Sequence, residues 1–88
     1  MLFRSVQSQY ADSNKEAIRD LNGALLRFPD HPDLLIELGN VYRLEADFRN
    51  AIKTHKHAVS KYPENRVARI ELSYDIYLQD QSDRKSVV

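Results

Sequence analysis

The sequence predicts an all-α fold in which antiparallel helical hairpins stack on one another. Apolar residues recur at i, i+3, i+4 and i+7 through much of the 88-residue chain. The three prolines fall where helices are expected to begin or end. The chain also matches itself at an offset of 34 residues, a length that suits two helices and their turns.

The repeat is visible residue by residue. At the offset of 34, Ala17 falls on Ala51, Pro29 falls on Pro63, and the Ile-Glu-Leu segment 36–38 falls on an identical segment at 70–72. A hairpin of this size cannot bury its apolar face alone and must stack on its neighbour.

Each expected helix has its own start or stop signal. Residues 13–16, Ser-Asn-Lys-Glu, predict a capping box. Pro32 suits a first helical position, and Asp47 and Asn65 suit N-caps. The expected helices cover residues 14–28, 33–46, 48–61 and 66–79, with a short additional helix before Tyr10.

The pattern also predicts the core. The small residues Gly39, Ala51 and Ala58 are expected to let paired helices approach closely, so a large residue at position 39 costs about 1–3 kcal/mol. The residues expected in the core are Ala17, Leu21, Ala24, Leu38, Val41, Tyr42, Ala51, Ile52, Ala58, Leu72 and Ile76.

Residues 32–65 resemble a tetratricopeptide repeat. The resemblance rests on Leu38-Gly39-Asn40 with Tyr42, followed by Asp47-Phe48, Ala51-Ile52, Ala58 and Pro63. It implies one full repeat at 32–65 between partial repeats at 6–31 and 66–82, with the hairpins stacked in a right-handed superhelix. Ala46 departs from the family by replacing a glycine, and His55 departs by replacing an aromatic residue.

Composition excludes several classes of protein. Thirteen basic and 13 acidic residues give no net charge, so the basic excess of a general nucleic-acid binder is absent. Hydrophobic residues make up 42%, too many for a disordered chain. There is no cysteine, and no signal peptide or membrane-spanning run is visible. We expect a cytoplasmic location, with the periplasm as the alternative.

The sequence contains no constellation that favours catalysis. The only two glycines, Gly23 and Gly39, are too far apart for a phosphate loop. His55 and His57 are two positions apart, so on a helix they face different sides, and they are expected to be solvated or interfacial. We therefore expect a non-enzyme with no catalytic residue, no cofactor and no metal.

The family resemblance implies a concave groove that binds a protein or peptide partner. Asn40 would bond a peptide backbone, and Arg43 would pair with an acid of the ligand. Glu37 and Glu71 would repel the carboxylate-rich chaperone tails that some family members bind. The alternative is that these side chains pack against a neighbouring repeat or are solvated. The implied groove residues are Ile36, Glu37, Asn40, Arg43, Ile70, Glu71, Tyr74 and Tyr77.

A narrower similarity links segments 38–43 and 49–55 to the bacterial lipopolysaccharide assembly protein B family. Those segments read Leu-Gly-Asn-Val-Tyr-Arg and Arg-Asn-Ala-Ile-Lys-Thr-His. The alternative function is thus a structural repeat segment of a bacterial envelope-assembly protein, or the periplasmic repeat domain of an outer-membrane protein.

Both ends of the chain resemble translated sequencing adapters. We therefore interpret residues 1–5 and 83–88 as non-native and residues 6–82 as a fragment of a longer repeat domain. The last helix is apolar on two sides, which predicts an exposed patch, marginal stability and self-association.

Overall fold

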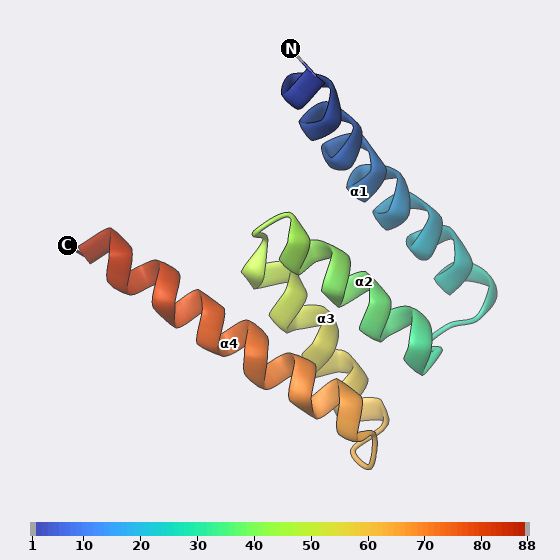
Figure 1. Cartoon of the computed structure of the whole chain (residues 1–88). Coiled ribbons are helices and arrows are strands. Elements are labelled where there is room, and N and C mark those ends of the chain that lie inside the picture. The colour runs from blue at the N-terminus through green and yellow to red at the C-terminus, as the bar shows by residue number, and fades with distance from the viewer. Residues whose placement is uncertain (1, 88) are drawn as a thin grey trace.

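The computed structural model consists of four α-helices: α1 (Leu2–Arg27), α2 (Pro32–Leu44), α3 (Phe48–Lys61) and α4 (Arg66–Val87) (Figure 1). The structure describes the backbone of residues 2–87 and the side chains of residues 13–82. Residues 2–87 contain no strand, so the predicted all-α class is confirmed.

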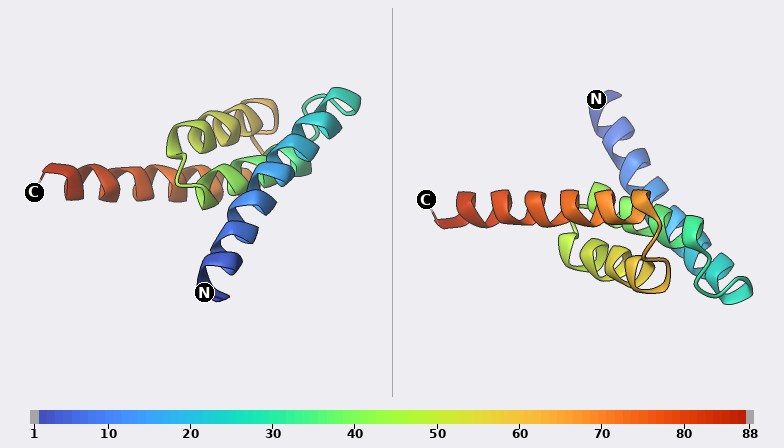
Figure 2. Two further views of the ribbon diagram at one scale, coloured as in Figure 1. Left: turned by 90° about the horizontal axis from the view of Figure 1, so that it is seen from above. Right: turned by 90° about the horizontal axis from the view of Figure 1, so that it is seen from below.

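Helices that are consecutive in sequence lie side by side and run in opposite directions (Figure 1). α2 packs against α1 and α3, and α3 packs against α4. α2 also contacts α4, whereas α1 and α3 do not pack against each other over the described residues. The N-terminal part of α1 leads away from the other three helices (Figure 2).

The boundaries of α2 and α3, the end of α1 and the start of α4 agree with the prediction to within two residues, but the start of α1 and the end of α4 do not. Residues 2–27 form one helix, so the predicted break and capping box at Ser13 are wrong. No proline lies in this segment, and a serine costs little inside a helix. α4 continues beyond Gln79 to Val87 because no glycine or proline follows Pro63. The proposal that residues 1–5 and 83–88 are non-native concerns side chains outside the described ones and stays a prediction.

Two of the predicted caps are confirmed. The Asp47 carboxylate accepts a hydrogen bond from the Asn50 amide at 3.3 Å. The Asn65 side-chain oxygen accepts one from the Ala68 amide at 3.2 Å. α2 begins differently, because His31 occupies its N-cap without a side-chain bond and Pro32 supplies the first turn.

The hydrophobic core lies between α2, α3 and α4, and its buried members are Leu35, Leu38, Val41, Ala51, Ala58 and Ala68. Four of these were predicted. Ile76 is 49% exposed, so its assignment to the core is wrong. It lies on a side of α4 that no described helix covers. The other predicted core residues, Ala17, Leu21, Ala24, Tyr42, Ile52 and Leu72, are partly buried.

Ala46 adopts a left-handed backbone conformation, which glycine tolerates better than alanine. Its φ is 60°, and its amide donates to the Arg43 carbonyl at 2.9 Å.

Replacing Ala46 by glycine has two opposing effects on stability. Glycine avoids the cost of about 1–2 kcal/mol that an alanine has in the left-handed conformation. Glycine also makes the unfolded chain more flexible, which lowers the free energy of unfolding by about 0.4–1 kcal/mol. We expect Ala46→Gly to raise the free energy of unfolding by about 0.5–1 kcal/mol in urea denaturation. Ala24→Gly, within helical α1, should instead lower it by about 1 kcal/mol. Equal losses in both variants would contradict this explanation.

Candidate functional site

Four ionisable side chains join α2, α3 and α4 in one ionic cluster: Arg43, His55, Glu71 and Asp75. The Arg43 guanidinium donates to Asp75 Oδ1 at 3.0 Å and to Glu71 Oε2 at 2.6 Å. It also donates to the side-chain oxygen of Asn40 at 3.2 Å. His55 and Asp75 are fully buried, so the cluster lies inside the helix packing.

His55 is the central member of the ionic cluster, contrary to the expectation that it is solvated or interfacial. Its Nδ1 contacts Asp75 Oδ2, and its Nε2–H donates to the Ile36 carbonyl at 3.0 Å. Both ring nitrogens therefore face acceptors, and a proton must lie between Nδ1 and the carboxylate. His57 points to a different side of α3, as predicted, and its side chain is 45% exposed.

Gly39 makes room for the His55 ring. A Cβ built on Gly39 would overlap the imidazole. Because Gly39 has no side chain, the His55 ring fits between α2 and α3. This explains why a small residue is needed at position 39.

The charges of the ionic cluster compensate one another. Burial by itself would lower the pKa of Arg43, but the hydrogen bonds and charges of Glu71 and Asp75 outweigh it and raise that pKa. Arg43 is thus opposed by two carboxylates, and the contact between His55 Nδ1 and Asp75 Oδ2 holds a proton between those two side chains. Arg43 and Glu71 are consequently paired within the chain, so the expectation that Arg43 awaits an acid of a ligand needs correction.

α4 carries an exposed apolar stripe, formed by Val67, Ile70, Tyr74 and Tyr77. Each of these side chains is 50–58% exposed. Their spacing of three, four and three residues places them on one side of the helix. The Arg43 guanidinium lies 4.8 Å from the centre of the Tyr74 ring, so the ionic cluster supports one edge of the stripe.

A hollow of about 320 Å³ separates α2 from the start of the α4 stripe. Its lining consists of Asp33, Ile36, Glu37, Asn40, Asn65 and Val67. We refer to this hollow together with the α4 stripe as the α2–α4 face. The eight implied groove residues lie on these two helices: three line the hollow, two belong to the ionic cluster, and Ile70, Tyr74 and Tyr77 belong to the stripe.

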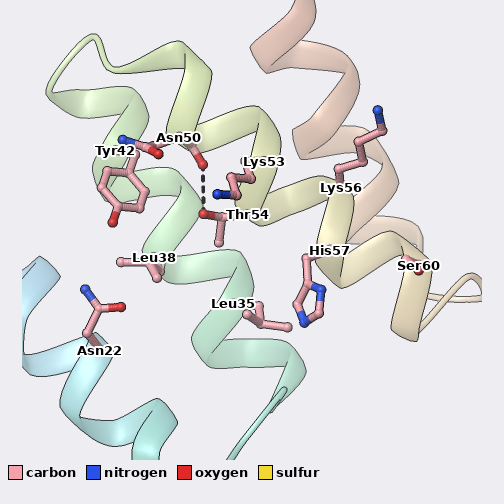
Figure 3. Close-up of a pocket in the computed structure, with 10 residues that line it drawn as sticks. All are labelled: Asn22, Leu35, Leu38, Tyr42, Asn50, Lys53, Thr54, Lys56, His57 and Ser60. Carbon is pink, nitrogen blue, oxygen red and sulfur yellow. Dashed lines mark hydrogen bonds between the residues drawn. The ribbon is translucent and has the colours of Figure 1, made fainter.

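A second hollow, of about 610 Å³, is bounded by α1, α2 and α3 (Figure 3). Leu35 and Leu38 form its floor, Asn22 faces it from α1, and Lys53 and His57 border it on α3. The two leucines of its floor are only 6% and 4% exposed. The sequence analysis did not predict this hollow.

No family model, curated protein or solved structure matches this chain. Within the described residues, no group of three or more histidine or acidic side chains is placed to hold a metal ion. No helix of the described part is both long and apolar enough to cross a membrane.

Sequence reasoning did not predict that Asp75 and His55 are buried together, although the repeat contained a signal for both. At the offset of 34, Asp75 falls on Val41 and His55 falls on Leu21. Two polar residues thus replace apolar ones at core positions of adjoining units. Such a paired exchange indicates a buried polar contact, because either residue alone would be costly there.

A separate, exposed ionic group connects the α1–α2 loop to α3. Asp30 pairs with His57 at 2.6 Å and with Lys61 at 3.7 Å. The hydrogen bond from His57 lowers the pKa of Asp30, and the charges of His57 and Lys61 act in the same direction. The Asp30 carbonyl also accepts a bond from the Tyr62 hydroxyl at 2.6 Å.

The lowered pKa of Asp30 predicts acid sensitivity. A carboxyl group whose pKa is lower in the folded chain than in the unfolded chain stabilises the folded state at pH values above its unfolded pKa. This stabilisation is lost as the pH falls through the pKa that the group has in the folded chain. Asp30→Asn keeps a residue that tolerates φ of 60°. We expect wild type to melt slightly above Asp30→Asn at pH 6, and the difference to shrink as the pH falls below the ordinary pKa of an aspartate, about 4. A difference that persists at low pH would contradict this origin.

Proposed function

We propose that this chain is a non-catalytic protein-binding module of the tetratricopeptide-repeat type, with successive hairpins in a right-handed superhelical arrangement. A peptide or helix of a partner protein would lie on the α2–α4 face. The observation that carries the proposal is the α4 stripe, where four large apolar or aromatic side chains on one helix are about half exposed.

The chemistry of the stripe suits partner binding. Tyrosine offers a large contact area and a polar tip, and it is enriched among residues that dominate binding energy. Tyr74 is also preorganised, because the Arg43 guanidinium lies over its ring and is itself bound by two carboxylates. A rigid aromatic anchor loses little side-chain entropy on binding.

A peptide-display selection tests the proposal. Random 16-residue peptides are selected against the full chain, and their affinities are measured by fluorescence anisotropy. We expect Ile70→Ser and Tyr77→Ala to weaken the selected ligands by tenfold or more. Both side chains are more than half exposed, so the helical content of the variants should match wild type by circular dichroism.

Leu26→Ala is the matched control, because Leu26 is 85% exposed on α1, outside the α2–α4 face. It should leave binding unchanged. If Leu26→Ala weakens binding as much as the stripe variants, or if ligands tolerate both stripe variants, the α2–α4 face is not the binding surface. A chain that serves only as a structural spacer would yield no ligand directed to the stripe.

A further inference from the structure

The charges around the α2–α4 face distinguish one kind of partner from another. Asp33 and Glu37 are exposed, and both line the hollow beside the stripe. Neither carboxylate has a hydrogen bond or an ion pair within the described part of the chain. They lie four positions apart on α2, so they follow one another along the same side of that helix.

Of the other charged groups near the face, one is paired within the chain and two lie outside the hollow. Arg43 is bound to Glu71 and Asp75, and Asp75 also contacts His55. Arg66 and Arg69 of α4 do not line the hollow. The uncompensated charge at the hollow is therefore negative, although the whole chain has no net charge.

The apolar stripe indicates the secondary structure of the partner segment. From Val67 to Tyr77 the stripe advances about 15 Å along α4 at 1.5 Å per residue. Its three-four-three spacing matches the seam with which one helix packs along another. A partner helix with apolar residues at the same spacing would cover it over about three turns.

From these observations we propose that the partner segment is a basic amphipathic helix, a proposal that rests on the proposed function. Its apolar side chains pack on the α4 stripe, while lysine or arginine residues along one border reach Asp33 and Glu37. Ile36 and Val67, which line the same hollow, contact the aliphatic stems of those basic side chains.

Two synthetic 18-residue helical peptides test this proposal. Both carry leucine at positions matching the stripe, and they differ only in flanking residues, which are lysine in one and glutamate in the other. We expect the lysine peptide to bind at least tenfold more tightly at low salt. The difference should shrink as ionic strength rises, because exposed charge pairs are screened.

The variants locate the effect. Asp33→Asn with Glu37→Gln should weaken the lysine peptide about 3- to 10-fold and leave the glutamate peptide unchanged or tighter. Glu16→Gln with Asp20→Asn makes the same change of charge on exposed positions of α1, and should alter neither affinity. Equal binding of the two peptides, or equal effects of the two double variants, would overturn the proposal.

The display selection separates this proposal from the proposed function. If selected ligands depend on Ile70 and Tyr77 but show no excess of lysine or arginine, the chain binds partners through the stripe and the basic partner is wrong. If no ligand depends on the stripe, both proposals fail.

Discussion

Asp75→Ala is expected to remove about 3–5 kcal/mol from the free energy of unfolding, enough to leave much of this small chain unfolded. The side chain is fully buried and accepts from both Arg43 and His55. Its loss leaves the buried His55 without its partner, removes one of the three acceptors of the partly buried Arg43, and opens a cavity between α3 and α4. Urea denaturation followed by circular dichroism measures the change.

Asp75→Asn separates charge from hydrogen bonding. The asparagine oxygen can still accept from Arg43, and its amide can donate to Nδ1 of a neutral His55 whose Nε2–H still donates to Ile36. We expect a smaller loss, about 1–2 kcal/mol. Asp20→Ala, an exposed carboxylate on α1, should change stability by less than about 0.5 kcal/mol. An Asp75→Ala effect as small as that of Asp20→Ala would contradict the structural importance of the ionic cluster.

Gly39→Ala is expected to destabilise the chain by about 2 kcal/mol or more, although the same exchange elsewhere in a helix stabilises it by about 1 kcal/mol. The added Cβ would overlap the His55 ring and expel it from its bonds to Asp75 and Ile36. Each hydrogen bond to a charged group contributes about 1.5–3 kcal/mol, so the loss outweighs the gain in helix propensity.

The sign of the Gly39→Ala effect is therefore the decisive result. Gly23 provides the matched control, because a Cβ there meets nothing within 4 Å. Gly23→Ala should raise the thermal midpoint, whereas Gly39→Ala should lower it. In a double-mutant cycle, Gly39→Ala should cost much less once His55→Ala has removed the ring. A stabilising Gly39→Ala would show that His55 does not occupy the space beside Gly39.

The sequence predicted most of the helices because local signals and periodicity agreed. Asp47 and Asn65 cap helices as expected, and the 34-residue offset matched α2 with α4. The start of α1 and the end of α4 were not predicted, because a helix without a proline or a strong cap can continue wherever its neighbours permit. Ser13 resembled a cap only in sequence, since its backbone is helical.

The candidate site was less predictable from sequence than the fold. The resemblance selected residues of α2 and α4, and their role in binding stays a prediction, but it treated Arg43 and Glu71 as free to meet a ligand, whereas the two side chains pair with each other. Their pairing depends on Asp75 and His55, which come from different repeats and meet only after the helices pack. The sequence shows that such polar residues exist, but only the packed structure shows that their charges compensate.

The most direct test of the account is to map a bound ligand by nuclear magnetic resonance. The ¹⁵N-labelled chain is titrated with a display-selected peptide, and shift changes are assigned by residue. The account predicts that they concentrate at Ile36, Val67, Ile70, Tyr74 and Tyr77. Changes concentrated instead at Asn22, Leu38, Lys53 and Thr54 would place the ligand between α1 and α3, and would contradict the α2–α4 face as the binding surface.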